Sequence, residues 1–403
     1  MSIPITISRD LYIERIKPFI RKGLIKVLSG QRRVGKSYLL FQLVHFIRSQ
    51  EPEANIIYIN KEDLQFDSIR DAASLNVYVL SQSRAGVRNY IFIDEVQDIA
   101  EFEKALRSLL LDENNDIYIT GSNASLLSGE LATYLSGRYI EFKVYSLSYP
   151  EFLQFHKRED SDVSFESYVK FGGLPYLVHL GLEDISFEYL NSVYNTIVYR
   201  DVVSRYNLRS SQFLERLVEF LAGNMGSLFS AKRISDFLKS QHTTASPNQV
   251  LQYCTYLTNA FIIHEASRYD LIGRRVFERG SKFYFENTGI RNAIIGYQLK
   301  DRGQLLENVV YNHLLGLGYD VKVGAFHAKE VDFVCDRGNE RIYVQVALRL
   351  GEPGTIEREF GNLLEIPDNY PKIVVSESLF DGNTYQGIQH MRIREFLLTS
   401  SIS

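Results

Sequence analysis

Residues 30–37 read Gly-Gln-Arg-Arg-Val-Gly-Lys-Ser, and this stretch decides the fold of the region around it. It fits the phosphate-loop pattern G-x-x-x-x-G-K-[ST] and lies between a strand candidate at residues 24–29 and a helical pattern at residues 38–47. Glycines let such a loop wrap so that backbone N–H groups point at phosphate oxygens, and the following helix N-terminus adds partial positive charge. A dinucleotide-binding fingerprint is excluded, because no G-x-G-x-x-G follows this strand.

The loop predicts that ATP and Mg²⁺ are bound here. We expect Lys36 to contact the β- and γ-phosphates and to take part in catalysis, and Ser37 to ligate Mg²⁺. Two further cations in the loop, Arg32 and Arg33, would raise the local positive potential. The predicted nucleotide contacts are Gly30, Gln31, Arg32, Arg33, Val34, Gly35, Lys36, Ser37 and Tyr38.

A second strand candidate, residues 89–94, is apolar and ends in two carboxylates, Asp94 and Glu95. An apolar run of this kind is buried in a parallel sheet, so its acids emerge at the carboxyl edge, where ligands bind. Asp94 is expected to hold Mg²⁺. Glu95 is expected to position or deprotonate the attacking water, which a hydrolase needs and a simple nucleotide binder does not.

Polar residues that follow the remaining strands give weaker candidates. The strand at residues 116–121 leads into Ser122 and Asn123, either of which could hydrogen-bond the γ-phosphate or the attacking water, with Thr120 as an alternative. Arg138 precedes the last strand and could reach a γ-phosphate in a neighbouring subunit of a homo-oligomer, could act within its own subunit, or could serve structure only.

The order of the patterns indicates the fold class. Strand candidates alternate with helical patterns in the first 150 residues, which predicts an α/β fold with a parallel sheet and helices on both faces. Beyond Pro150 the pattern becomes helical, and from residue 305 a helix and further strands follow. The five strands expected in the sheet are residues 24–29, 55–60, 89–94, 116–121 and 139–145.

Composition excludes several classes of protein. The chain has 403 residues, too many for one ordinary core, and its net charge of −4 gives no global attraction to nucleic acid or to anionic membranes. Two distant cysteines fit neither a disulfide framework nor a zinc site. No signal peptide or membrane-length apolar run is present, so we expect a cytoplasmic protein without membrane contact.

These motifs together resemble those of AAA-type ATPases in which the acidic strand is not adjacent to the phosphate-loop strand. Phe171-Gly-Gly-Leu-Pro175 and Tyr199-Arg-Asp201 further resemble a large prokaryotic family of AAA ATP-binding proteins with a C-terminal domain of unknown function. The resemblance implies an AAA-type P-loop core (1–150), a helical lid (151–207), a winged helix (208–300) and a nuclease-like α/β domain (301–403). It also raises the hypothesis that Arg200 in the lid senses the nucleotide.

The expected winged helix gives the chain its candidate DNA contact. Its third helix would begin with Ser246 as N-cap and Pro247 in the first turn, but residues 246–258 contain no Lys or Arg, so this helix alone would bind DNA weakly. The loop after it is more basic, and three hypotheses remain open: a DNA-contacting wing, a solvated hairpin, and a surface for a protein partner or another domain. The basic residues of this loop are Arg268, Arg274, Arg275, Arg279 and Lys282.

The last hundred residues resemble the PD-(D/E)xK nuclease fold in their order of acids. Glu307 on a helix and Asp332 on a strand take the places of metal-binding acids, and Glu330 lies two residues before Asp332. However, Gln345 stands where a second acid is usual, and Ala347 occupies the position of the lysine. We therefore expect an inactive nuclease-like domain.

Three functions are compatible with these sequence features. The leading hypothesis is ATP binding and hydrolysis that drives a conformational change of the C-terminal domains, with ATP and ADP as ligands. The alternatives are an ATP-regulated DNA-binding protein and, with Ala347 against it, an ATP-dependent nuclease.

Overall fold

The structure is a computed structural model, and it forms two compact units. One unit comprises Met1–Tyr145 with Asn259–Phe261, and the other comprises Ser146–Thr258 with Ile262–Ser403. The residues that the structure describes are 6–124, 135–208, 211–240, 245–276, 280–327, 329–350, 353–378, 380 and 383–402.

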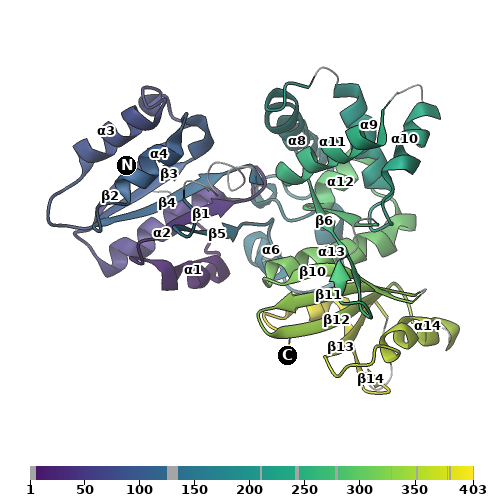
Figure 1. Ribbon diagram of the computed structural model, residues 1–403. Coiled ribbons are helices and arrows are strands. Elements are labelled where there is room, and N and C mark those ends of the chain that lie inside the picture. The colour runs from purple at the N-terminus through teal and green to yellow at the C-terminus, as the bar shows by residue number, and fades with distance from the viewer. Residues whose placement is uncertain are drawn as a thin grey trace. The chain divides into compact units, whose positions relative to one another are not determined.

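The first unit is built on a parallel sheet of five strands in the order β2-β3-β4-β1-β5 (Figure 1). Strand β4 pairs with both β1 and β3, so the strand that ends at Asp94 is separated from the strand that leads into the phosphate loop. This is the order that the AAA-type resemblance implies, and the chain has the α/β fold predicted from its sequence. The strands are β1 (Ile25–Ser29), β2 (Asn55–Asn60), β3 (Asn89–Asp94), β4 (Asn115–Gly121) and β5 (Tyr139–Lys143).

Helices cover both faces of this sheet. Apolar side chains of α3 (Ala72–Gln82) and α4 (Phe102–Leu109) pack on the isoleucines of the strands and form the main core of the unit. Helix α2 (Lys36–Gln50) covers the other face and contacts α1 (Asp10–Ile16) (Figure 1). The sheet is covered on both faces, and β1, β3 and β4 are buried along their whole length.

Aromatic rings line the α2 face of the sheet. Tyr58, Phe92 and Tyr118 stack from strand to strand, with ring centroids 6.2 and 4.6 Å apart, and Phe41 of α2 stacks on Tyr58 at 5.3 Å. These contacts hold β2, β3 and β4 in register beneath α2, so the carboxyl ends of the strands meet at one edge.

The second unit begins with helices. Its first three helices and an eight-residue π-helix are followed by a helical module of three helices and a two-stranded antiparallel sheet, β6–β9. Gln249 N–H donates to the Ser246 hydroxyl, so the predicted cap of α11 is present. The elements are α6 (Tyr149–His156), α7 (Asp162–Phe171), α8 (Asp184–Thr196), the π-helix Ile197–Ser204, α9 (Ser211–Gly223), α10 (Ala231–Ser240), α11 (Pro247–Asn259), β6 (Ile263–Ala266), β9 (Lys282–Phe285) and α12 (Thr288–Ile295).

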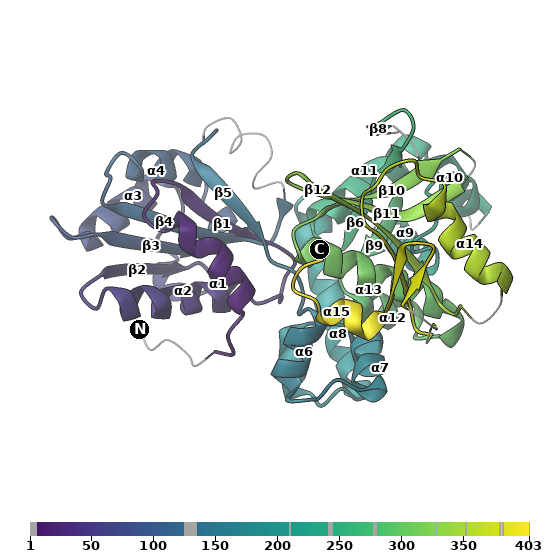
Figure 2. The same ribbon diagram turned by 90° about the horizontal axis from the view of Figure 1, so that it is seen from below.

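The C-terminal region contains a mixed sheet of eight strands in the order β14-β15-β13-β12-β11-β10-β7-β8. Its strands β10, β11 and β12 lie side by side in Figure 2. The outer hairpin comes from the basic loop, because Tyr269 and its neighbours pair in parallel with β10. The elements are β7 (Arg268–Asp270), β8 (Arg275–Val276), α13 (Arg302–Gly316), β10 (Asp320–Phe326), β11 (Lys329–Arg337), β12 (Glu340–Ala347), α14 (Pro353–Leu364), β13 (Lys372–Ser376), β14 (Thr384–Tyr385), β15 (Ile388–Arg392) and α15 (Ile393–Leu398).

Short 3₁₀ turns complete the described chain, at Lys17–Phe19, Leu64–Phe66, Val96–Asp98, Pro175–His179 and Leu299–Asp301. Among the helices of the described residues, none combines the length and apolar character needed to cross a membrane.

Candidate functional site

The phosphate loop has a backbone that depends on its glycines. Gly30 has φ +154°, and a Cβ added there would lie 2.1 Å from the carbonyl oxygen of Val144, so a larger residue does not fit. Gly35 has φ 97°, which is left-handed, and it is the residue from which α2 begins. The loop therefore passes directly from the end of β1 into the N-terminus of a 15-residue helix.

Lys36 is the first residue of α2, and its side chain is buried. Its ammonium donates to the carbonyl oxygens of Gly30 and Gln31, at 2.9 and 3.0 Å. These two bonds fold the lysine back over its own loop. Phosphate oxygens would compete for the same ammonium protons, so the arrangement fits a lysine that binds phosphate.

Asp94 ends β3 and is buried beside Ser37 and Thr120. Burial raises the pKa of its carboxyl group, while hydrogen bonds from Thr120 and Ser37 act in the opposite direction. A buried carboxylate with a raised pKa gains from a nearby cation, which would favour its charged form. Asp94 and the Ser37 hydroxyl are oxygen donors of the kind that Mg²⁺ prefers, so this pair fits the metal.

Glu95 follows with a left-handed backbone, φ 56°. Its N–H donates to the Thr120 hydroxyl at 2.9 Å, and its carboxylate accepts from Gln97 and from the Ser122 hydroxyl, the latter at 3.3 Å. Burial alone would raise the pKa of Glu95, but the charges of Lys36 and Arg32, together with the hydrogen bonds from Gln97 and Ser122, outweigh burial and the pKa is lowered. The carboxylate is therefore charged at neutral pH, as a group that orients or deprotonates water must be.

The other predicted site residues lie at different distances from this centre. Ser122 reaches Glu95, whereas Thr120 is engaged with Asp94 and Glu95. Asn123 is buried directly after β4. Arg138 is exposed before β5 and is not among the main charges that act on either acid in the described part of the chain. Within the loop, Val34 and Arg32 are buried, while Arg33 and Tyr38 are exposed.

Sequence reasoning missed Arg9, which supports the phosphate loop from outside the motif. Its guanidinium is buried and donates to the carbonyl oxygens of Val34 and Tyr145, both at 3.0 Å. It also lies over the ring of Tyr12, 4.6 Å from the centroid. Arg9 thus connects the phosphate loop to the segment that directly follows β5. Nothing in the sequence near Arg9 signals this role, because its partners are backbone groups distant along the chain.

Lys282 does not behave as one of the candidate DNA-contacting cations of the basic loop. It is buried and forms ion pairs with Glu307 and Glu330, so it cannot neutralise a DNA phosphate, which agrees with the hypothesis of packing against another part of the chain. Arg275 lies 3.8 Å from Asp270, and Arg274 is exposed. Arg268 is half-buried on β7, and Arg279 lies outside the described residues.

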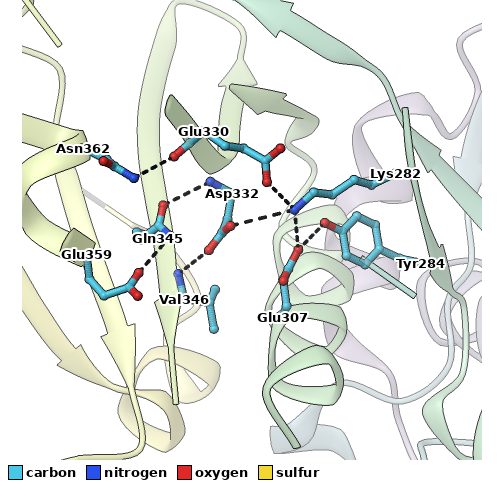
Figure 3. Close-up of polar contacts among 9 residues, drawn as sticks. All are labelled: Lys282, Tyr284, Glu307, Glu330, Asp332, Gln345, Val346, Glu359 and Asn362. Carbon is cyan, nitrogen blue, oxygen red and sulfur yellow. Dashed lines mark hydrogen bonds and ion pairs between the residues drawn. The ribbon is translucent and has the colours of Figure 1, made fainter. Parts of the chain in front are cut away.

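The predicted nuclease acids also converge on Lys282, as Figure 3 shows. Gln345 is turned towards Glu359 of α14, an acid that the sequence did not single out. Strand β12 ends at Ala347, so Arg349 is exposed beyond it and does not replace the missing lysine. No group of three or more His, Cys, Asp or Glu side chains among the described residues is placed to hold a metal ion.

Comparison with known proteins gives two family matches and several full-length relatives. Residues 22–153 match an AAA domain, and residues 162–301 match a domain of unknown function. An uncharacterized protein of Haemophilus influenzae is 35% identical, over 97% of this chain and 98% of that protein. An uncharacterized protein of Methanocaldococcus jannaschii is 31% identical, over 88% of this chain and 80% of that protein.

Similar solved structures include the Walker-type ATPase of Pyrococcus abyssi, at a TM-score of 0.46 and 16% identity, over 72% of this chain and 96% of that chain. The Orc1 protein of Aeropyrum pernix, solved in complex with DNA, has a TM-score of 0.34 and 12% identity, over 72% of this chain and 93% of that chain.

Proposed function

This chain belongs to the family of AAA-domain proteins that includes its Haemophilus influenzae relative, and on that premise we propose that it is a Mg²⁺-dependent ATPase. The observation that supports the proposal most is the meeting of four side chains at one sheet edge. Lys36 and Ser37 begin α2, Asp94 ends β3, and Glu95 follows it; the charge of Lys36 acts on both acids.

Each of these residues has its own task in the proposed reaction. The backbone of the glycine-rich loop cradles phosphate, and Lys36 neutralises charge on the transferred group. Ser37 and Asp94 are the residues that would hold Mg²⁺, which supplies charge neutralisation at the phosphates when it is bound. Glu95 orients the attacking water and accepts its proton, because its lowered pKa keeps it ionised.

The proposal extends to conformational change. The nucleotide state would bias the arrangement of the C-terminal domains through contacts that depend on the γ-phosphate, as in other nucleotide switches. The winged helix, the DNA contact and a role for Arg138 in a neighbouring subunit remain predictions.

The test is phosphate release from ATP by the purified full chain, with Mg²⁺ or with excess chelator. We expect turnover that needs Mg²⁺ and that falls at least about 100-fold in Lys36→Ala, because a preorganised cation at the transferred phosphate is lost. Lys22→Ala, at an exposed lysine of the same unit, is the control and should keep the parental rate. Parental turnover in Lys36→Ala would refute the proposed site.

A further inference from the structure

A buried lysine lies at the centre of the nuclease-like acids in the second unit. Lys282 begins β9, and its side chain is only 5% exposed. Its ammonium lies 2.7 Å from a carboxylate oxygen of Glu330, 3.1 Å from one of Glu307 and 4.0 Å from one of Asp332 (Figure 3). One cation is thus shared by acids from α13 and β11, two elements that follow β9 in the chain.

The carboxylates are held in place by further hydrogen bonds. The Tyr284 hydroxyl donates to Glu307 at 2.6 Å, and the Val346 N–H donates to Asp332 at 2.8 Å (Figure 3). Behind them, Gln345 accepts from the Asp332 N–H at 3.2 Å and donates to Glu359 at 3.0 Å. Glu307 and Asp332 therefore have fixed hydrogen-bond partners in addition to Lys282, the one cation that they share with Glu330.

The electrostatics show that the cluster needs this positive charge. Burial alone would lower the pKa of Lys282, but Glu307, Asp332 and Glu330 outweigh burial and raise its pKa above the ordinary value. Burial and the charge of Glu307 raise the pKa of Asp332, which Lys282 opposes. Removal of the ammonium would leave three buried or half-buried acids without their common counter-ion, a costly state inside a protein.

We propose that the ammonium of Lys282 is the resident cation of this site and takes the place that a divalent metal ion would hold in an active nuclease of the predicted fold. The site then acts as a metal-independent clamp: it binds strand β9, which belongs to the helical module, to α13 and β11 of the C-terminal sheet region. The presence of Ala347 agrees with this assignment. In the nuclease fold that this domain resembles, the lysine at that position activates a water molecule at the metal site, and a site without a metal ion does not require it.

A neighbouring pocket gives solution access to the clamp. It has a volume of about 430 Å³, and Lys282 and Glu330 form part of its wall together with side chains of α9 and α10, among them Phe220 and Arg233. An ion that enters this pocket meets Glu330 directly and the position of the Lys282 side chain beside it, which makes the assignment testable by metal binding.

The experiment compares the parent with Lys282→Met in the full chain without nucleotide, using thermal unfolding and Mn²⁺ binding by electron paramagnetic resonance. With chelator, we expect the variant to unfold several degrees below the parent. With millimolar Mn²⁺ it should recover most of this loss and bind about one Mn²⁺ more per chain than the parent, because the freed carboxylates are hard oxygen ligands.

Lys322→Met is the matched control, because Lys322 also pairs with two acids, Asp320 and Asp336, which lie on adjacent strands of the C-terminal sheet. It should gain no Mn²⁺ site, because Arg341 still pairs with Asp336 and the other acid, Asp320, is an exposed carboxylate. The conservative Lys282→Arg, which keeps a positive charge, should fold and also gain none. The proposal is overturned if Lys282→Met folds and gains no Mn²⁺ site.

The parent protein provides a second test that does not depend on the folding of Lys282→Met. We expect its Mn²⁺ binding to be unchanged by Asp332→Asn, since no metal is held by Asp332 in the parent. If the parent binds Mn²⁺ that Asp332→Asn removes, or cleaves DNA with Mn²⁺ in a manner that Asp332→Asn abolishes, then Lys282 is not the resident cation and the proposal is wrong.

Discussion

At the scale of single residues, one hydroxyl group positions the two acids of the proposed ATPase site. Thr120 Oγ1 donates to the carboxylate of Asp94 and accepts the N–H of Glu95, whose backbone is left-handed at φ 56°. A non-glycine residue in this conformation is strained, and it persists only where its surroundings hold it. Thr120 is thus a positioning residue for the Asp94–Glu95 pair.

Replacement of Thr120 by Val keeps the shape of the side chain and removes this hydroxyl. The buried N–H of Glu95 then loses its partner, at a cost of about 1–3 kcal/mol, and Glu95 is free to leave the position in which it faces Ser122. We expect kcat for ATP to fall by about 10- to 100-fold, with a smaller change in KM. Thr120→Ser keeps the hydroxyl and should recover most of the rate; equal loss in both variants would contradict this role.

The residues that sequence predicts well are those whose partners lie within one motif. Lys36 and Ser37 belong to the phosphate-loop motif, and Asp94 and Glu95 lie at the end of an apolar strand candidate. Local sequence patterns were therefore sufficient to predict these four residues as parts of an ATP site. The role of Lys282 was left open between DNA contact and packing for the opposite reason. Its partners, Glu307 and Glu330, are distant in the sequence, and a lysine in a basic loop carries no sign that it will be buried.

At the scale of elements, helix α13 carries a histidine that makes the stability of the second unit depend on pH. His313 is buried, its ring lies 5.3 Å from that of Phe396, and burial lowers its pKa to about 4 from the ordinary 6.5. Between these values the unfolded chain binds more protons than the folded chain. The free energy of unfolding therefore falls as the pH is lowered from about 6.5 towards about 4.

The change that tests this is His313→Asn, followed by chemical unfolding at several pH values. The variant should be less stable at neutral pH because of lost packing. On acidification its free energy of unfolding should fall by less than that of the parent, and the two losses should differ by at most about 3 kcal/mol. His327→Asn, at an exposed histidine of the same unit, is the control and should leave the dependence of the free energy of unfolding on pH unchanged. A parental slope in His313→Asn would show that other groups cause the acid sensitivity.

Element prediction succeeded where periodicity was strong and failed where tertiary pairing decides the structure. Strand β3 was predicted with its bounds, because its four apolar residues between Asn89 and Asp94 are typical of a strand buried on both faces. The strands β7 and β8 are only three and two residues long, so the basic loop gave no sign that it joins the C-terminal sheet. That pairing depends on β10, which pairs with β11 and, in parallel, with β7.

At the scale of the whole molecule, charge limits what the chain can bind. Its net charge is −4, and the burial of Lys282 leaves Arg274 and Arg275 as the exposed cations of the described part of the basic loop. Each neutralised phosphate contributes a slope of about −0.9 to the dependence of log K on log salt. We therefore expect weak binding of duplex DNA with a slope of about −2, measured by fluorescence anisotropy across a salt series.

A double variant, Arg274→Glu with Arg275→Glu, should remove this binding, while Lys300→Glu at an exposed site elsewhere in the same unit should not. A slope of about −5 or steeper, or binding that survives the double variant, would place the contact on a different surface.

The large-scale organisation was predictable in part. Alternating strands and helices indicated the parallel sheet of the first unit. The resemblance of the motifs implied that the acidic strand is not adjacent to the phosphate-loop strand, and in the structure β4 lies between β3 and β1. The boundaries at residues 150, 208 and 300, together with the winged-helix and nuclease-like assignments, remain predictions. Sequence patterns could not show that β9 and the C-terminal acids share one buried charge cluster, because that depends on the packing of segments far apart in the chain.

The most direct test of the central claim is single-turnover hydrolysis of ATP by Glu95→Gln, with ATP binding measured on the same preparation. The amide keeps the size of the side chain and removes its ability to accept a proton, so we expect parental ATP affinity and a chemical step at least about 100-fold slower. Parental hydrolysis by Glu95→Gln would contradict the account, because the water would then be activated by a group other than the carboxylate beside Asp94.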